Sequence, residues 1–405
     1  MRLLQHKDQK YFNQTGIRRC WFIRSAEEVY LDIKQNQEYL KQRHPRSYDF
    51  TTMYTMLKHE EIIHNVREAI QEAKKYIKEG LTPAEADTYD KILDPEKKLM
   101  EHVKFIVKNT YLCTNKGALR HQVIGIPMGT NTVPELANLT LYYDEAKFID
   151  DFTTPKDGKS VNAQEGEQKA KQHCFNFRLI DDILTWNEEP PSPKIYGLEW
   201  LETTGKDGSV IFLGGKIRCR DGRLQIEVFD KAAEWKFPFI RYPHADSNVP
   251  YHQPAGVFQG QLVRFRTICN SIRAFKQATT QLVRRKLARG HKPWILVKGW
   301  NAHLQKFSND RITNYSRLRQ WFRRMLWWSQ CNPMQPSSRK PYPLKQWVPK
   351  QQPPANTQTN CLENRPQHPP APPKNNNLRH RLLKVYGCQN TNKNNLSRIP
   401  INKSK

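Results

Sequence analysis

The alternation of apolar and polar residues predicts a chain of mixed helices and strands. Residues 60–70 and 91–108 carry apolar side chains at helical spacing, and residues 26–40 form a charged stretch of helical character. Residues 47–54 are rich in Thr, Phe and Tyr, which favour a strand. Residues 177–186 alternate around two adjacent acids, a pattern that predicts a strand, a tight turn and a second strand. The first half of the chain therefore predicts an α+β fold.

The pattern changes in the second half of the chain. Residues 210–218 and 223–229 are predicted strands joined by Asp221-Gly222, which is a strong hairpin signal. Residues 264–324 are helical in pattern. Beyond Gln330 the chain is rich in Pro, Asn, Gln and Lys, cannot bury a core, and is expected to be disordered.

Polar stretches mark the expected connections. Residues 79–88 and 190–193 are predicted to be a loop and a linker, and residues 150–173 an exposed insertion. Residues 111–113 and 119–124 are expected to pair as a hairpin around a short turn that contains glycine.

A loop rich in glycine and proline follows the predicted hairpin and precedes a predicted helix. Residues 125–134 hold two glycines and two prolines, so they cannot form a regular element and are expected to let backbone approach a neighbour closely. Thr132 and Glu135 have the spacing of a capping box, and the following helix is expected to run to about Ile149. A helix N-terminus after such a loop suits an anion, although an ordinary turn is the favoured interpretation of this loop when it is taken alone.

Composition and charge narrow the class of partner. The 405 residues suffice for two or three domains, and a formal net charge of +27 points to a polyanion such as nucleic acid. Eight cysteines are scattered without a Cys-x-x-Cys pair, so neither a zinc site nor a disulfide framework is predicted. The N-terminus lacks the apolar core of a signal peptide, and no apolar run is long enough to span a membrane. We therefore expect an intracellular protein in a reducing compartment.

Basic residues concentrate in the predicted helices of residues 264–324. This stretch is dense in Lys and Arg, contains a single acid, Asp310, and carries several tryptophans. Basic side chains interleaved with aromatic ones suit a phosphate backbone and stacked bases. An amphipathic helical bundle with a basic outer face is the alternative interpretation, and both can hold together.

Three acids are the candidate chemical groups. Asp181 and Asp182 interrupt an apolar run, and Asp49 lies at a predicted strand end just before a helix. Neighbouring carboxylates repel each other, and a divalent cation relieves that repulsion. A surface turn with two acids is the simpler interpretation of Asp181 and Asp182 alone.

Taken in order, these pieces resemble the palm domain of reverse transcriptases. Residues 49–55 resemble the first catalytic motif of that family. Residues 122–129, with Pro134 and Asn138 downstream, resemble the second. Residues 178–182 resemble the third, an x-Asp-Asp box, and Phe212-Leu213-Gly214 resembles the hairpin that grips the primer. The resemblance covers about residues 45–310. The Gly-Ile-Pro-Met-Gly-Thr-Asn form of the second motif is similar to reverse transcriptases of eukaryotic retroelements, including Penelope-like elements.

The resemblance implies an architecture. It implies an α+β right-hand polymerase fold, in which an antiparallel palm sheet backed by helices is followed by a helical thumb and a disordered tail. The implied segments are a remnant of the fingers at residues 1–48, the palm with partial fingers at 49–243, the basic thumb at 244–330, and the tail at 331–405.

The resemblance also implies an activity and its participants. The activity is that of an RNA-directed DNA polymerase, with an RNA template, a DNA primer, deoxynucleoside triphosphates, two Mg²⁺ ions or Mn²⁺ in their place, and a nuclear location. It implies Asp49 and Asp181 as metal-bridging ligands with Asp182 beside them. Tyr54 would pack under the sugar and exclude a 2′-hydroxyl. The implied nucleotide-binding residues are Phe50, Tyr54, Gln122, Pro127, Met128 and Gly129. The candidate nucleic-acid-binding residues are Arg264, Arg266, Arg273, Lys276, Arg284, Arg285 and Lys286. Arg178 is interpreted as structural.

Two departures from the family pattern keep a second function open. Leu179 stands where relatives often have an aromatic residue, and only 48 residues precede Asp49, where a fingers region usually holds the triphosphate. We therefore expect a truncated chain that binds primer–template but extends it weakly. The alternative is a catalytically impaired, reverse-transcriptase-like protein that only binds nucleic acid. A two-metal nuclease would use similar carboxylates, but it would not explain the loop at residues 125–134.

Overall fold

The computed structural model describes residues 1–83, 85–87, 89, 96–113, 117–154, 163–235, 240–250, 252–307 and 315–333. The chain divides into two units, residues 1–338 and 339–405, and all described residues lie in the first. The predicted disordered tail lies outside the described residues from 334 onward. None of the helices in the described ranges is long and apolar enough to cross a bilayer.

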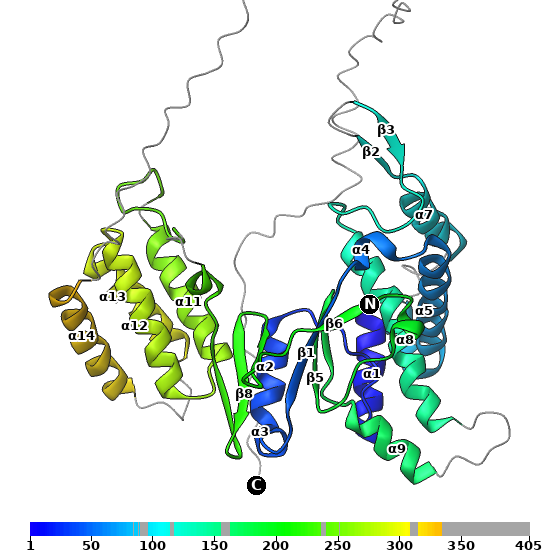
Figure 1. The fold of residues 1–405 in the computed structure, drawn as a ribbon, viewed down its shortest axis with the longest axis horizontal. Coiled ribbons are helices and arrows are strands. Elements are labelled where there is room, and N and C mark those ends of the chain that lie inside the picture. Colours follow the sequence, from blue (N-terminus) through cyan, green and yellow to red (C-terminus); the bar gives the residue numbers. More distant parts are fainter. Residues whose placement is uncertain are drawn as a thin grey trace, which may run out of the picture. The chain divides into compact units, whose positions relative to one another are not determined.

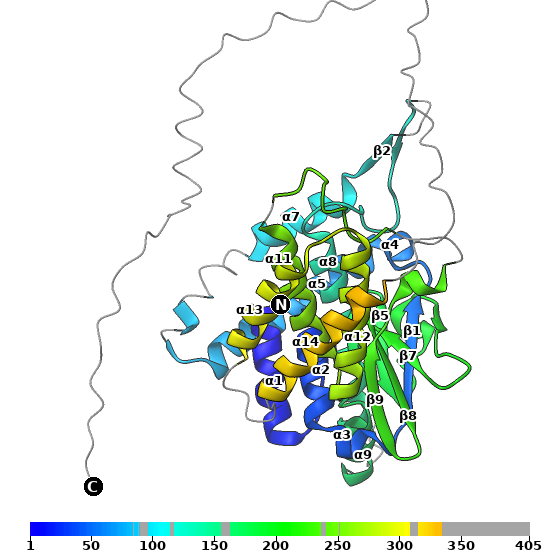
Figure 2. The same cartoon turned by 90° about the vertical axis from the view of Figure 1, so that its left-hand side faces the viewer.

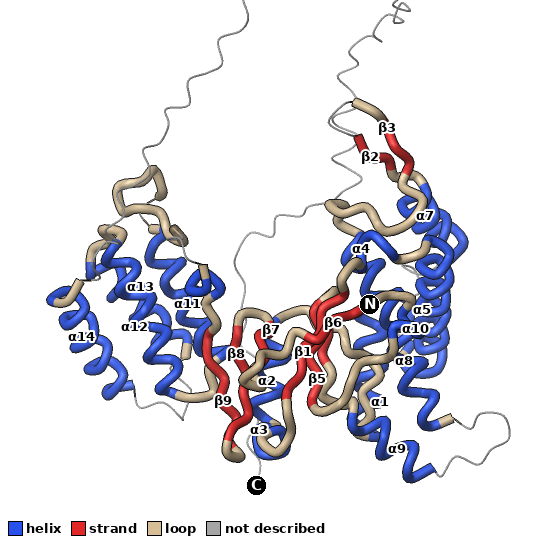
Figure 3. The backbone as a smooth tube through the Cα atoms, viewed as in Figure 1, coloured by secondary structure: helices blue, strands red, loops and turns tan. Residues whose placement is uncertain are grey.

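A four-stranded antiparallel sheet, called the central sheet here, holds the three candidate acids (Figure 3). Its strands, in spatial order, are β4 (Phe177–Leu179), β5 (Asp182–Trp186), β1 (Pro45–Phe50) and β6 (Trp200–Glu202). Strand β1 pairs with β5 from Pro45 opposite Trp186 to Asp49 opposite Asp182. The strand predicted at residues 47–54 is thus shorter, because the chain turns after Phe50 into α4 (Met53–Met56).

Helices cover one face of the central sheet. Tyr48, Phe50 and Ile183 point to that face and join one core cluster with residues of the helices. The helices are α5 (His59–Gly80), α7 (Glu96–Lys108) and α8 (Val133–Thr153), and α1 (Arg2–Thr15) packs against α5 (Figure 1). The opposite face carries Leu184 and Trp186, which pack in a second core cluster.

The second core cluster joins α2 (Ala26–Gln35), followed by α3 (Gln37–Leu40), to a three-stranded meander. The meander consists of β7 (Val210–Phe212), β8 (Gly215–Arg220) and β9 (Arg223–Val228). Both of its turns have two central residues at positive φ, Leu213-Gly214 at 43° and 79° and Asp221-Gly222 at 50° and 65°. That is the requirement of a type I′ hairpin turn. The Asp221-Gly222 turn is confirmed, whereas the single strand predicted at 210–218 is wrong, because it breaks at Leu213-Gly214.

Several predicted connections are helical instead. Helix α5 extends to Gly80, and residues 83, 85–87 and 89 are helical too, so the loop predicted at 79–88 is wrong. Part of the predicted insertion is α9 (Ala163–Gln172), which packs on α8, and part of the linker is α10 (Pro193–Tyr196). The hairpin of β2 (Tyr111–Cys113) and β3 (Leu119–His121) is confirmed, with a shorter second strand.

The helical prediction for the basic stretch is confirmed. Four helices form it: α11 (Gln253–Ile268), α12 (Ile272–Ala288), α13 (Pro293–Lys306) and α14 (Tyr315–Cys331), after the short 3-10 helix η1 (Lys231–Glu234) (Figure 2). Trp300 and Phe322 stack in their core with ring centroids 4.3 Å apart. Trp294, Trp327 and Trp328 are exposed, so they are not core residues, and their stacking on bases stays a prediction.

Candidate active site

A strained two-residue turn carries the paired acids. Leu179 and Asp182 are the last paired residues of β4 and β5, so Ile180 and Asp181 alone form the turn. Ile180 has a φ of 59°, a region that β-branched residues rarely occupy. Such a residue costs about 1–3 kcal/mol and persists only where its surroundings hold it. Residues 179–182 are called the acidic turn below.

The acidic turn lies beside the end of β1. Asp49 is directly opposite Asp182, and directly opposite residues of an antiparallel pair project to the same face. The backbone N–H of Phe50 donates to the carbonyl oxygen of Asp181 at 3.3 Å. The structure thus places Asp49 and Asp182 at one end of the sheet, on the face opposite α5 and α8, with the turn residue Asp181 next to them in the chain.

The surroundings of Asp49 and Asp182 raise the pKa values of their carboxyls. Partial removal from water, followed by the negative charge of Asp181, raises the pKa of Asp49. Asp182 remains exposed as a residue, yet desolvation of its carboxyl and the charges of Asp181 and Asp49 raise its pKa to about 6. The site is therefore a concentration of negative charge with few compensating groups.

Lys231 is the compensating group that sequence patterns missed. It begins η1 just after β9, and its positive charge opposes the rise in the pKa of Asp182. No motif marks this lysine, because its nearness to Asp182 depends on the path of the chain after the meander.

The carboxylates suit magnesium in donor chemistry but do not form a finished metal cage. Mg²⁺ prefers oxygen ligands and is often held by one or two carboxylates together with water and substrate phosphates. Within the described residues, no three His, Cys, Asp or Glu side chains are gathered closely enough to hold a metal ion. A metal ion at this site would need oxygen ligands beyond these side chains.

Phe50 and Tyr54, two aromatic residues that follow Asp49, differ in their burial and contacts. Phe50 is buried and packs edge-on against Tyr196, with ring centroids 5.0 Å apart, so it supports the sheet and does not face a ligand. Tyr54 lies in α4 and is half-buried. Burial, followed by the charge of Asp181, raises the pKa of Tyr54, which places its phenol near the acidic turn.

The loop at residues 125–134 packs on α4 by close backbone contact. Ile126 N–H donates to the Tyr54 carbonyl oxygen at 2.7 Å. A Cβ on Gly125, whose φ is 85°, would lie 2.5 Å from that same oxygen. This is the close approach predicted for the loop, and it couples the loop to Tyr54. The predicted capping box is wrong, since Thr132 makes no side-chain cap hydrogen bond to α8.

The remaining predicted nucleotide-binding residues divide by exposure. The Gln122 amide donates to the Ile124 carbonyl oxygen at 3.0 Å within the loop, and Pro127 is buried. Met128 and Gly129 are exposed, and Gly129 has a φ of 104° with open space around it. Met128 and Gly129 therefore present the most surface to a ligand, Gln122 is half-buried, and Pro127 presents none.

Most of the predicted nucleic-acid-binding residues are engaged within the helices. Arg264 and Arg273 are exposed. Others lie against rings or acids: Arg266 over Phe307, Lys276 over Trp321, Arg284 over Trp328, Arg285 paired with Asp230, and Lys286 over Tyr242. Lys286 is buried, with 2% of its surface exposed. Its assignment as a phosphate-binding residue stays a prediction, and this burial argues against it.

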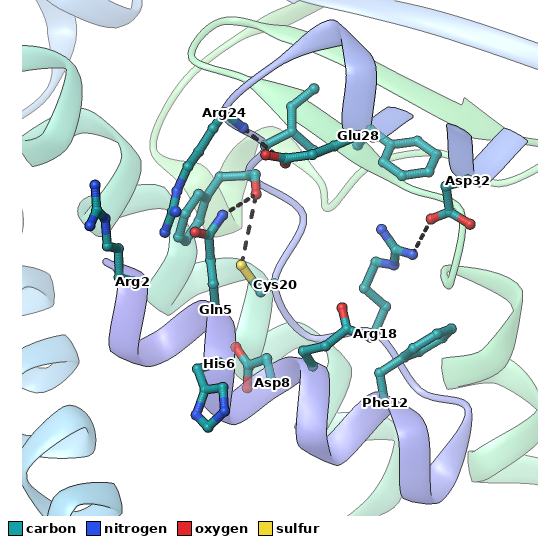
Figure 4. Close-up of a pocket in the computed structure, with 14 residues that line it drawn as sticks. Arg2, Gln5, His6, Asp8, Phe12, Arg18, Cys20, Arg24, Glu28 and Asp32 are labelled. Atoms are coloured by element: carbon teal, nitrogen blue, oxygen red, sulfur yellow. Dashed lines mark hydrogen bonds and ion pairs between the residues drawn. The ribbon is translucent and has the colours of Figure 1, made fainter. Parts of the chain in front are cut away.

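A separate cavity lies between α1, α2 and the segment that joins them (Figure 4). It measures about 470 Å³, and its wall includes Asp8, Cys20 and an Arg18 that is ion-paired with Asp32. None of the three candidate carboxylates lines this cavity. It is therefore distinct from the candidate active site.

Comparison with known proteins gives a coarse answer. No protein family and no curated protein matches the sequence. Solved structures similar to the chain include the telomerase from Candida albicans in complex with the TWJ fragment of telomeric RNA, at 11% identity and a TM-score of 0.41. They also include the apo telomerase from Candida tropicalis, at 12% identity and a TM-score of 0.37.

The coverage of these structures is partial. The alignments cover 75% of this chain but 48% and 50% of the two telomerase chains, so this chain spans about half their length. At such identities the likeness concerns the coarse fold of mixed helices and antiparallel sheets.

Proposed function

We propose that this chain is a template-directed nucleotidyltransferase of the reverse transcriptase type, an RNA-directed DNA polymerase. The arrangement of its acids carries the proposal. Asp49 stands opposite Asp182 at the end of an antiparallel sheet, and a strained turn presents Asp181 beside them. A surface turn with two acids gives no reason for a third acid across the sheet or for a β-branched residue at positive φ.

Each group has a proposed role in joining a primer 3′-hydroxyl to a nucleotide. Asp49 and Asp181 would hold magnesium, with Asp182 completing the negative site. Bound magnesium stabilises the attacking and leaving oxygens of such a displacement. Tyr54 would lie under the incoming sugar, where its ring leaves no room for a 2′-hydroxyl, and Met128 with Gly129 would contact the base pair. Lys231 would limit repulsion around Asp182.

The proposed architecture follows from these roles. The central sheet with α5 and α8 would be the palm within residues 49–243, and α11–α14 would be the thumb within residues 244–330. Residues 1–48 would supply part of the fingers. RNA template, DNA primer and deoxynucleoside triphosphates are the proposed partners, and a retroelement origin with a nuclear location remains a prediction from the sequence motifs.

A nucleic-acid-binding protein without catalysis is the second candidate. The observation that favours it is the lack of three gathered metal ligands within the described residues, combined with the basic character of α11–α14. This candidate shares every binding partner with the first and differs in the bond-forming step alone.

Primer extension separates the two candidates. The full chain is incubated with a DNA primer on an RNA template, deoxynucleoside triphosphates, and Mg²⁺ or Mn²⁺. Extension that Asp181→Asn and Asp49→Asn abolish, while binding persists, supports the polymerase. Asp221→Asn is the matched control, because it changes an exposed turn aspartate of the meander, where Asn also tolerates positive φ. Binding without extension supports the second candidate, and failure to bind primer–template contradicts both.

A further inference from the structure

A fully buried arginine lies two residues before the strained isoleucine of the acidic turn. Arg178 belongs to β4, and none of its side chain is exposed. Its backbone is held by residues 21–23, since its N–H donates to the Trp21 carbonyl oxygen at 2.7 Å and its carbonyl oxygen accepts from Ile23 N–H at 2.9 Å. These two hydrogen bonds therefore fix the backbone from which the Arg178 side chain extends.

The guanidinium joins helix α8 to the acidic turn. Its Nε and Nη2 donate to the two carboxylate oxygens of Glu145, at 2.5 Å and 3.1 Å. Its Nη1 donates to Asn138 Oδ1 at 2.8 Å and to the Ile180 carbonyl oxygen at 3.2 Å. Asn138 and Glu145 both lie on α8, seven residues apart, which puts them on one face of that helix.

A second group fixes the carboxylate of this pair. The Tyr196 hydroxyl donates to Glu145 Oε1 at 3.3 Å, and the Glu145 side chain is also fully buried. Asn138, Glu145, Arg178 and the Ile180 carbonyl form one connected network, called the arginine clamp below. It links the helix that begins after the loop at residues 125–134 to the turn that carries Asp181.

Stability alone is a poor explanation for the clamp. Two charges taken out of water lose so much hydration that well-packed apolar residues often serve a fold equally well. What an apolar pair cannot supply is direction, because a guanidinium offers five donors in a rigid fork. Here one arm of that fork reaches the carbonyl of the residue that carries the strain.

We propose that Arg178 is the positioning residue of the acidic turn: it ties Ile180 to α8 and so sets Asp181 and Asp182 opposite Asp49. This inference rests on the proposed function of the three carboxylates. It also links the loop at residues 125–134 to the acidic turn through α8. That helix starts where the loop ends, and its residues Asn138 and Glu145 bind Arg178. A displaced α8 would displace the carboxylates.

Arg178→Lys is the decisive variant. Lysine keeps a positive charge beside Glu145 but loses the fork that reaches Asn138 and Ile180. Arg19→Lys is the matched control, because Arg19 makes a two-pronged contact with Asp150, at 2.7 Å and 2.5 Å, near the C-terminal end of α8. Its other hydrogen bonds go to Asp8 and Glu72 and not to the acidic turn, so it tests whether loosening α8 alone disturbs that turn. Both variants lose the same chemistry from a partly or fully buried ion pair.

Two measurements follow the turn without requiring catalysis. Hydrogen exchange of the Phe50 amide reports the bond to Asp181, and Mn²⁺ alone, titrated by electron paramagnetic resonance, reports the carboxylates. We expect both variants to lower the urea midpoint. We expect Arg178→Lys alone to speed Phe50 exchange at least tenfold and to weaken Mn²⁺ binding at least tenfold, with the Leu184 amide still protected. If extension is measurable, kcat falls while KM for primer–template stays unchanged.

The outcomes decide separately on the clamp and on the function. If Arg178→Lys and Arg19→Lys have the same Phe50 exchange rate and the same Mn²⁺ affinity, the clamp is merely structural and the proposal is overturned. If the wild-type chain neither binds Mn²⁺ nor extends a primer, the proposed function fails, yet Phe50 exchange still decides on the clamp. Should Arg178→Lys not fold, the double variant Arg178→Met with Glu145→Met is judged by the same exchange criterion.

Discussion

Asp182 gives the candidate active site a predictable pH dependence. Its pKa in the folded chain is about 6, above the ordinary value of 3.8, because of desolvation and the charges of Asp181 and Asp49. A raised carboxyl pKa means that the fold favours the protonated form. The contribution of Asp182 to stability is therefore complete below about pH 4 and is lost as the pH rises through 6.

Asp182→Asn should stabilise the metal-free chain at pH 7.5 and leave its stability nearly unchanged at pH 4. Asparagine removes the repulsion that exists only when the carboxyls are ionised. Because Asp182 is exposed, the gain is expected to be about 1 kcal/mol or less. Urea denaturation at the two pH values measures it, with Asp221→Asn as the control. A gain of the same size at both pH values would contradict the electrostatic cause.

The buried cation Lys286 is expected to give stability the opposite pH dependence. Burial lowers its pKa to about 8 from 10.5, and its ammonium lies 4.1 Å from the centre of the Tyr242 ring. A lowered lysine pKa means that stability is lost as the pH falls through 8. Lys286→Met should therefore raise the free energy of unfolding at pH 6 by about 1–2 kcal/mol, after the lost cation–π contact is subtracted. The gain should be smaller above pH 10, and the urea midpoints at the two pH values show it. A lower midpoint at pH 6 would show that the contact with Tyr242 outweighs burial.

Among the helices, exposure decides which basic residues can meet a phosphate. Arg264 and Arg273 are exposed, whereas Lys286 is buried. The double variant Arg264→Ala with Arg273→Ala should weaken binding to primer–template and reduce the slope of log affinity against log salt by about 1–2. Lys286→Met should leave both unchanged. Fluorescence anisotropy at several salt concentrations tests this, and an unchanged slope in the double variant would place the binding surface elsewhere.

The contact between the loop at residues 125–134 and α4 depends on one glycine. Gly125→Ala would force a Cβ to 2.5 Å from the Tyr54 carbonyl oxygen at a φ of 85°. Gly129→Ala meets only the backbone strain, because nothing lies within 4 Å of its Cβ position. We expect Gly125→Ala to lower stability by about 2–4 kcal/mol and Gly129→Ala by about 1 kcal/mol. Equal urea midpoints for the two variants would show that the loop moves freely away from α4.

The local elements were largely predictable from sequence, whereas their contacts were not. The acidic turn and the Asp221-Gly222 hairpin have local patterns, and both occur where they were expected. Strand β6 was missed because three residues are too few to show an alternation. The hydrophobic pattern missed the break at Leu213-Gly214, because a leucine at positive φ leaves no signal in it, although the family resemblance indicated a hairpin at Phe212-Leu213-Gly214. Arg178 was interpreted as structural, but its partners on α8 emerge only from tertiary packing.

At the scale of the whole chain, the same limit applies to the charges. The net charge of +27 predicts a polyanionic partner, but it does not distinguish a free basic side chain from one that packs on a ring. Five of the seven basic residues proposed for nucleic acid contact internal rings or an acid. The helices were predictable from sequence, but the exposure of their basic side chains was not, because burial is decided by packing between helices.

The pairing of β1 with β5 also sets an order of events during synthesis. The hairpins of the meander join neighbouring residues, so they can close as soon as they leave the ribosome. Strand β1 is the centre of its sheet, yet its partners β5 and β6 are made more than a hundred residues later. At translation rates of about 5–20 residues per second, Asp49 waits roughly 7–27 s for Asp182 to be made. During that interval β1 has both edges open and Tyr48 and Phe50 lack the strand they pack beside, so a nascent chain stalled before residue 182 is expected to be prone to aggregation and dependent on chaperones.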